Sequence, residues 1–150
     1  MRVRGKFSLS IDDQVALEVP NLLVNNATLF LAAIISGFSS PPGNLSNYIY
    51  AMRLGQGGNT PPNPTQTELV NPLAPYFYIS SRSWTSNRAV LIATISGLNN
   101  GTSFNEAGLY AKFSDGSSDT SGLIARTVFP MKVYDASKNY TLTWQIEISL

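Results

Sequence analysis

Residues 140–150 read YTLTWQIEISL, and this stretch decides the fold. Apolar and polar residues alternate through it without a break. The apolar members are Tyr140, Leu142, Trp144, Ile146, Ile148 and Leu150. Successive side chains of a strand point to opposite faces, so a period of two with one apolar face indicates a strand half buried against a core. We therefore expect a sheet with one covered face.

Other stretches of the chain show strand patterns as well. They cover residues 3–11, 14–19, 48–54, 76–83, 89–96, 108–112 and 123–129. Turn-forming residues, mainly Asp, Asn and Gly, stand between most of them. Short strands divided by such turns predict an all-β fold, either an antiparallel β-sandwich or a partly open barrel.

One helix interrupts this pattern, near residues 26–36. Asn25 or Asn26 suits its N-cap, since a side-chain oxygen there accepts a hydrogen bond from a free backbone N–H. Nearly all of its residues are apolar, so we expect a short helix that is buried on most sides, under a sheet or at a subunit contact. The predicted apolar stripe consists of Leu29, Phe30, Ala33 and Ile34.

A glycine- and proline-rich segment, residues 55–75, follows the strand predicted at 48–54. Its five prolines exclude a long helix or a central strand, so we expect a compact loop. It opens with GQGG, which superficially resembles a phosphate-binding loop. That motif needs Lys-Ser/Thr and a following helix, whereas prolines follow here. We interpret these glycines as turn residues.

Composition removes most catalytic classes. The 150 residues include no Cys and no His, which excludes disulfides, thiolate metal sites, a Cys nucleophile and the Ser-His-Asp triad. A glycosidase would need two facing carboxylates, and Glu147, the candidate partner of Glu106, lies on the polar face of the last strand. We therefore predict no catalytic residue, no cofactor and no metal.

The charge content is low. Charged residues make up 13% of the chain against a usual value of about 25%, and the net charge is +1. A field this weak steers neither nucleic acid nor membrane toward the protein. A weakly charged surface also resists self-association poorly, which favours a surface covered by neighbouring chains. We expect one domain over residues 1–150, with neither a signal peptide nor a membrane span.

Glu106 and Arg126 are the first candidate pair. Glu106 lies at the start of one predicted strand, and Arg126 lies inside the next apolar strand. If these strands pair, the two charges meet as a bidentate ion pair of structural importance. The alternative is two separate, solvated side chains.

Aromatic and arginine residues concentrate further upstream, around residues 76–88. Arg, Trp and Tyr are favoured at interface hot spots, and the same side chains also stack on sugars or bases or fill a core. All three interpretations stay open. The interface candidates are Tyr76, Tyr78, Arg82, Trp84 and Arg88.

Five segments in a fixed order carry a family resemblance. They are PNLLVNNATLFLAAIISG at 20–37, YIYAMRLGQGGNTPPNPTQTEL at 48–69, FNEAGLY at 104–110, LIARTVFP at 123–130 and TLTWQIEISL at 141–150. Together they resemble a class of small structural proteins from the virions of tailed bacteriophages. Two departures are Gln66-Thr67, where those proteins have Asp-Thr, and an additional Gly-Gly-Asn in the loop.

The resemblance implies a β-rich, non-enzymatic virion protein that assembles as a symmetric oligomer in the tail, baseplate or fibre, or on the head as a decoration protein. Its expected partners are copies of itself and other virion proteins. The alternative is a receptor- or carbohydrate-binding module of a phage adhesin, whose ligand would be a glycan of the host surface.

Overall fold

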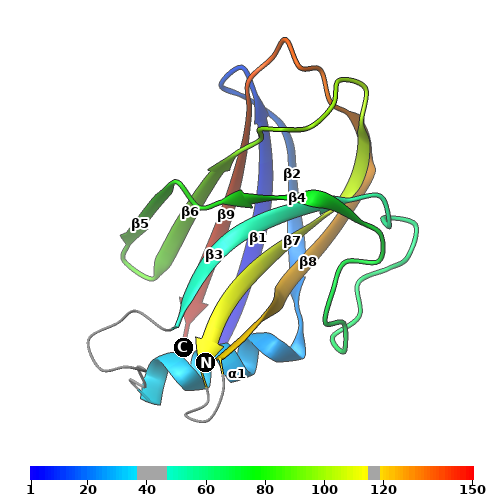
Figure 1. Ribbon diagram of the computed structural model, residues 1–150. Helices are drawn as coiled ribbons and strands as arrows, with labels where there is room; N and C mark the ends of the chain where they lie inside the picture. Colours follow the sequence, from blue (N-terminus) through cyan, green and yellow to red (C-terminus); the bar gives the residue numbers. More distant parts are fainter. Residues whose placement is uncertain (37–46, 115–118) are drawn as a thin grey trace.

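The computed structural model describes residues 1–36, 47–114 and 119–150 (Figure 1). Its elements are β1 (Arg2–Ile11), β2 (Gln14–Leu23), α1 (Asn25–Ser36), β3 (Tyr48–Gly55), β4 (Pro72–Tyr78), β5 (Ser81–Thr85), β6 (Arg88–Thr94), β7 (Ser103–Ser114), β8 (Asp119–Val133) and β9 (Tyr140–Ser149).

In the part of the chain that the structure describes, nine strands form one sheet in the order β4-β3-β7-β8-β2-β1-β9-β6-β5. Neighbouring strands run antiparallel, and the sheet curls strongly into a half-barrel (Figure 1). The predicted all-β class is confirmed, in the form of a partly open barrel.

The core fills the concave side of the sheet. Phe7 of β1 packs against Trp144 of β9 and Phe129 of β8, with ring centroids 5.2 and 5.7 Å apart. Phe104 of β7 adds an edge-on contact to Phe129 at 6.1 Å. These aromatic rings come from strands far apart in the sequence, so burying them ties the two halves of the sheet together.

Helix α1 lies across one end of the barrel and packs against β7 and β8 (Figure 1). Its buried side consists of Ala27, Phe30 and Ala33, whereas Leu29 and Ile34 are exposed. The expectation of burial on most sides is therefore wrong for the single chain, because the helix covers an end of the barrel and touches it along one face.

The helix also begins differently from the prediction. Asn25 is the first helical residue and not its cap, and its backbone N–H donates to the carbonyl of Pro64 at 2.7 Å. The proline-rich loop thus supplies an acceptor for one of the free N–H groups of the first helical turn.

The strand predicted at 76–83 is two strands. The chain leaves β4 at Tyr78 and enters β5 at Ser81, and these strands form the two opposite edges of the sheet. Curling brings the edges together: Ile79 N–H donates to Tyr50 O of β3, and Ser80 N–H donates to Ile92 O of β6. The place where these two edges meet is called the seam of the barrel. The single strand pattern that the sequence shows at 76–83 therefore crosses this seam.

Prolines stand inside three of the described strands, β2, β4 and β8. Pro72 and Pro75 lie in edge strand β4, where a missing N–H is tolerated. Strand β2 continues through Pro20, where the prediction had ended it. Its backbone ladder with β8 involves only Leu22 and Leu23, so at Pro20 the strand forms a backbone ladder with β1 alone among the described strands. On the β8 side, the Thr127 hydroxyl donates to Pro20 O at 2.8 Å.

Candidate functional site

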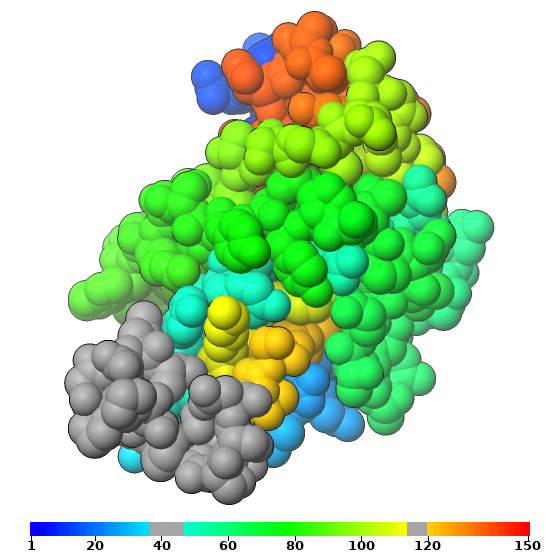
Figure 2. Space-filling view, in the orientation of Figure 1, coloured from blue at the N-terminus to red at the C-terminus, as the bar shows by residue number. Residues whose placement is uncertain are grey.

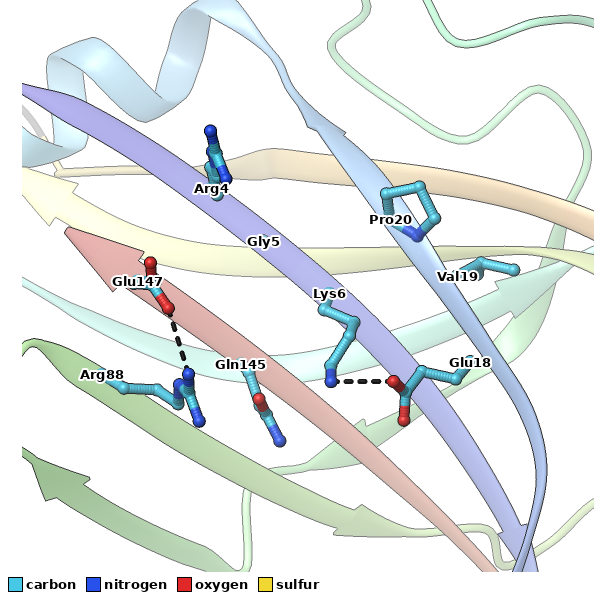
Figure 3. A pocket seen from close by; sticks show the side chains of 9 residues that line it. All are labelled: Arg4, Gly5, Lys6, Glu18, Val19, Pro20, Arg88, Gln145 and Glu147. Carbon is cyan, nitrogen blue, oxygen red and sulfur yellow. Dashed lines mark hydrogen bonds and ion pairs between the residues drawn. The ribbon is translucent and has the colours of Figure 1, made fainter. Parts of the chain in front are cut away.

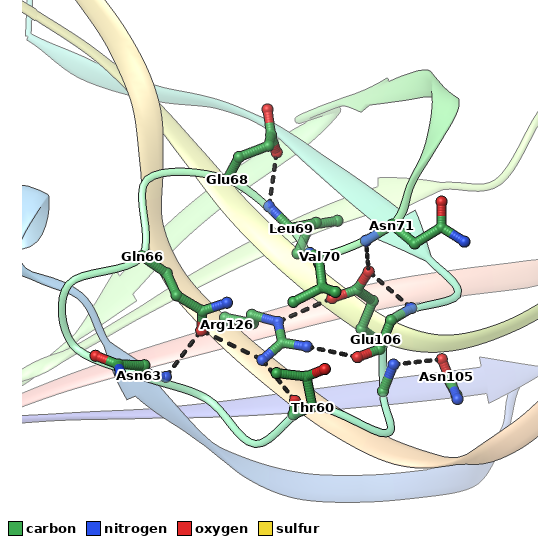
Figure 4. A network of polar contacts seen from close by, with 12 residues as sticks. Thr60, Asn63, Gln66, Glu68, Leu69, Val70, Asn71, Asn105, Glu106 and Arg126 are labelled. Carbon is green, nitrogen blue, oxygen red and sulfur yellow. Dashed lines mark hydrogen bonds and ion pairs between the residues drawn. The ribbon is translucent and has the colours of Figure 1, made fainter.

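The most elaborate polar site surrounds Glu106 and Arg126 on neighbouring strands β7 and β8. Arg126 Nε and Glu106 Oε2 lie 2.8 Å apart, and both side chains are 0% exposed. They point to the outer face of the sheet, opposite the main core, and the segment 56–71 folds back over them (Figure 4). This segment is called the covering loop below.

Glu106 binds the covering loop through backbone N–H groups. Oε1 accepts hydrogen bonds from Gly57 N (2.9 Å) and Asn71 N (2.8 Å), and Oε2 accepts one from Val70 N (3.2 Å). One carboxylate therefore holds both ends of the loop, and the Arg126 guanidinium balances its charge.

Arg126 binds the start and the middle of the same loop. Nη1 donates to Thr60 O at 3.0 Å and to Gln66 Oε1 at 3.3 Å, and Nη2 donates to Gly57 O at 2.9 Å. The bidentate pair with Glu106 that the sequence predicted does not form, because the terminal nitrogens bind loop oxygens instead. The pair acts as a clamp: Glu106 binds both ends of the loop, Arg126 binds its middle, and both side chains bind Gly57.

The glycines of GQGG are required by this close approach. A Cβ on Gly57 would lie 2.5 Å from Val70 Cβ and 2.7 Å from Glu106 Oε1. A Cβ on Gly58 would lie 2.2 Å from the carbonyl oxygen of Asn105, whose side-chain Oδ1 accepts a hydrogen bond from Gly58 N at 2.7 Å. Only a residue without a side chain fits at either position.

A second set of contacts fastens the far side of the covering loop. Tyr110 of β7 donates its hydroxyl hydrogen to Glu68, and Arg53 of β3 lies 3.6 Å from the same carboxylate. Burial raises the pKa of the Tyr110 phenol strongly, and the hydrogen bond to Glu68 and its negative charge add to the rise. Arg53 also stacks over the Tyr76 ring at 4.4 Å.

The clamp leaves little capacity for catalysis. A general base must reach a proton of the substrate and keep a lone pair available for it. Glu106 is fully buried and accepts four hydrogen bonds from the described residues, so it can do neither. Among the residues described, no group of three or more Asp or Glu side chains is placed to hold a metal ion.

The interface candidates do not form one aromatic strand, because they are divided between the two edges of the sheet. Tyr76 and Tyr78 lie on β4, Arg82 and Trp84 on β5, and Arg88 at the start of β6. Tyr78 is 69% exposed and Trp84 is 78% exposed.

The other three candidates already have partners within the chain. Tyr76 lies under Arg53, and Arg82 donates a short hydrogen bond to the carbonyl of Ile49 at the seam between β5 and β3. Arg88 forms an ion pair with Glu147 at 3.1 Å.

Two grooves lie near β6. A shallow groove of about 380 Å³ crosses the outer face, lined by Arg4, Gly5, Lys6, Glu18, Val19, Pro20, Arg88, Gln145 and Glu147 (Figure 3). The Lys6 hydrogen bond and charge hold the pKa of Glu18 below its ordinary value. The second groove, of about 410 Å³, is mainly apolar and lies beside Trp84.

Sequence reasoning missed the partners of the Glu106–Arg126 pair. Gln66 and Glu68 carry no local pattern that marks them as contacts of β7 or β8, since they are separated by 60 residues from Arg126 and by 42 from Tyr110. The sequence offered one signal, since the glycines of GQGG are followed directly by a proline-rich loop. This combination indicates a backbone that packs closely against another part of the chain.

Comparison with known proteins adds no relative: no family model, no curated protein and no solved structure matches this chain. None of the described helices is long and apolar enough to cross a membrane.

Proposed function

We propose that this chain is a non-enzymatic structural protein of a bacteriophage virion, which assembles through symmetric protein–protein contacts in the tail, baseplate or fibre or as a decoration of the head. Three segments of the sequence resemblance, GQGGNTPPNPTQTEL, NEAGLY and LIARTVF, meet in the clamp. Their polar groups hold a loop and leave no open chemical site. The meeting of these three segments is the observation that carries the proposal, because their polar groups then serve to hold the covering loop in place on the sheet.

Exposed apolar side chains favour assembly. Trp84, Ile35 and Ile148 are 78%, 77% and 40% exposed, although such residues are usually covered in a folded protein. An interface of about 1,200 Å² or more would cover them. The low charge of the chain fits this role as well, since it offers little repulsion between copies.

Mass spectrometry of purified particles of a phage that encodes this chain tests the location. The expected result is that the chain is present in a defined copy number, with hundreds of copies indicating the head shell and a few to a few dozen indicating the tail or neck. Absence of the chain from mature particles would contradict the proposal.

One observation favours the adhesin alternative. Tyr50, Tyr76 and Tyr78 cluster on the outer face, with ring centroids 6.2 and 6.4 Å from Tyr50, and Tyr78 is largely exposed. Exposed aromatic rings can stack on sugars. A glycan screen with wild type and Tyr78→Ala separates the two functions: specific binding that Tyr78→Ala removes, with assembly intact, supports the adhesin.

A further inference from the structure

The β5–β6 hairpin projects from the side of the molecule (Figures 1 and 2). Strand β5 stands at the end of the strand order and pairs with β6 alone among the described strands. All of its residues are exposed, and it packs mainly against β6. One long side of β5 is therefore open within the described part of the chain.

The two edges of the sheet differ in their protection against a further strand. Edge strand β4 contains Pro72 and Pro75, and its register against β3 shifts between Arg53 and Gly55. Prolines and irregularities of this kind prevent edge-to-edge pairing. Strand β5 contains neither Pro nor Lys, and its register with β6 is continuous. Its edge lacks these protections, so it can accept another strand.

The backbone groups on the open side of β5 belong to Arg82 and Trp84. Ile92 of β6 is opposite Ser81 and directs its carbonyl toward β5, where it accepts from Ser80 N at 2.8 Å. Hydrogen-bonded and non-hydrogen-bonded pairs alternate along an antiparallel ladder, so every second residue from Ser81 onward bonds to β6. The N–H and C=O of Arg82 and Trp84 therefore point away from β6. No backbone hydrogen bond joins them to another part of the described chain.

The side chains of β5 alternate between the two faces of the sheet. Arg82 is opposite the core residue Leu91, so Arg82 and Trp84 lie on the core-facing side and Ser83 lies on the outer side. Trp84 is nevertheless 78% exposed, because β5 lies at the open edge of the half-barrel. A strand added beside β5 would contact Trp84 on one face and Ser83 on the other.

We propose that β5 of one copy pairs with β5 of a second copy, antiparallel and about a two-fold axis at Ser83, so that the two sheets become continuous. This inference rests on the proposed assembly function and specifies one of its symmetric contacts. Arg82 of each copy is then opposite Trp84 of the other, and these two residues exchange both of their free backbone hydrogen bonds.

The sequence of β5 favours a second copy at this edge. With the axis at Ser83 the strands overlap fully, and the Arg82 guanidinium meets the Trp84 ring of the other copy, an attractive pairing. Arg82 can keep its hydrogen bond to Ile49 O, since a planar guanidinium stacks while it donates. An axis at Arg82 would set like charges opposite each other, and an axis at Trp84 would place Arg82 opposite Ser86 of the turn.

Charges at Ser83 test the pairing, because the axis places Ser83 opposite its own copy. Ser83→Lys and Ser83→Glu each set like charges opposite each other, whereas an equal mixture of the two variants sets opposite charges together. The interface is small, so we expect a wild-type dimer with a Kd between about 1 and 100 µM. Each variant should raise this Kd about fivefold, and the mixed dimer should be about tenfold tighter than either variant alone.

Sedimentation velocity at about 0.15 M salt gives the Kd values, and native mass spectrometry with one variant isotope-labelled identifies the mixed dimer. Because Ser83 is exposed, the urea midpoint of both variants should equal that of wild type. Trp84→Ala removes the ring that Arg82 meets and should raise the Kd about tenfold, since this contact occurs twice in the dimer.

Ser81 provides the matched control. It is exposed and lies on the same strand and the same face as Ser83, but the axis places its two copies about 14 Å apart. That separation exceeds the Debye length of about 8 Å at this salt concentration. We therefore expect Ser81→Lys, Ser81→Glu and their mixture to differ in Kd by less than about twofold.

Three results would overturn this pairing. They are Ser83 variants that associate as tightly as wild type, a mixture no tighter than its components, and a wild-type chain that stays monomeric at about 1 mM, as expected if the edge receives a strand of another protein. The proposed function is tested separately, by the presence of the chain in purified particles.

Discussion

At the scale of single residues, Glu106 and Arg126 show why a β-protein tolerates a fully buried ion pair. Burying a charge is costly unless a partner and hydrogen bonds replace the lost water. Here each side chain has such partners in the covering loop, and most of them are backbone groups that would themselves need partners. The pair therefore stabilises the loop more than it stabilises the two strands that carry it.

A double-mutant cycle measures this coupling. Glu106→Gln leaves Arg126 charged and buried, so we expect it to lower the free energy of unfolding by roughly 3–5 kcal/mol. Arg126→Met should cost a similar amount, and the double variant should cost at least about 1 kcal/mol less than the sum of the two. Urea unfolding of the four proteins gives the values.

The exposed Lys6–Glu18 pair is the control for that cycle. Its side chains are 41% and 49% exposed, and Lys6→Ala should cost less than about 1 kcal/mol. If the losses of unfolding free energy in Glu106→Gln and Arg126→Met simply add up in the double variant, the two residues are not coupled and the clamp is contradicted.

Tyr110 predicts a pH dependence. Burial raises the pKa of Tyr110 in the folded chain above the ordinary value of about 10 that holds in the unfolded chain. At a pH between the unfolded-state pKa and the folded-state pKa, the folded chain therefore keeps a proton that the unfolded chain releases. The stabilisation that Tyr110 supplies is complete below about pH 10 and declines as the pH rises above it. We expect the difference in unfolding free energy between wild type and Tyr110→Phe to shrink from about pH 8 to about pH 11. A difference independent of pH would contradict the assignment.

At the scale of elements, α1 and the covering loop both act as covers over a curled sheet. The helix closes one end of the barrel, and the loop covers the outer face of β7 and β8. They also support each other, because the first N–H of the helix donates to Pro64 of the loop. The helix is only 12 residues long, so its stability depends on packing more than on its own propensity.

Adjacent helix positions test how the helix packs. Phe30 is 5% exposed and lies 6.2 Å from the Phe113 ring, whereas Leu29 is 58% exposed. Phe30→Ala should lower the free energy of unfolding by about 3–5 kcal/mol. Leu29→Ala should lower it by less than about 1 kcal/mol. Urea unfolding at low protein concentration checks both, and equal losses would mean that Leu29 is covered as well.

At the scale of the whole molecule, the strand order makes the fold depend on both ends of the chain. Strand β9 lies between β1 and β6, so the last strand stands inside the sheet and not at its edge. Its Leu142 and Trp144 are 0% exposed, and Trp144 Nε1 donates to Asn21 Oδ1 of β2 at 3.2 Å. Removing β9 would break the strand ladder between β1 and β6, so that only the contacts at the seam would hold β5 and β6 to the rest of the sheet.

Truncation tests this dependence. Deleting residues 140–150 should abolish cooperative unfolding and the near-ultraviolet circular dichroism of the buried aromatic side chains, because the core loses a central strand. Deleting only Leu150, which is fully exposed, should change the free energy of unfolding by less than about 0.5 kcal/mol. A truncated chain that still unfolds cooperatively would show that the other strands form a core without β9.

Patterns within a few residues were sufficient to predict the all-β class and the buried face of 140–144, whereas Ile148 and Leu150 on the same predicted face are 40% and 112% exposed. Alternation reports directly which side chains turn inward, and Tyr140, Leu142 and Trp144 are indeed buried. The helix could also be placed near 26–36 from its composition. Its exposed side was not predictable, because an apolar sequence does not reveal how much neighbouring surface is available to cover it.

The sequence by itself therefore determined the all-β class, the approximate place of most strands and of the helix, and the lack of His and Cys side chains. Only the tertiary structure decided the order of the strands, the break at the seam between Tyr78 and Ser81, and the partners of Glu106 and Arg126. The physical reason is that periodicity is a property of neighbouring residues. A partner 49 residues away, such as Gly57 for Glu106, is chosen by the closure of the whole barrel.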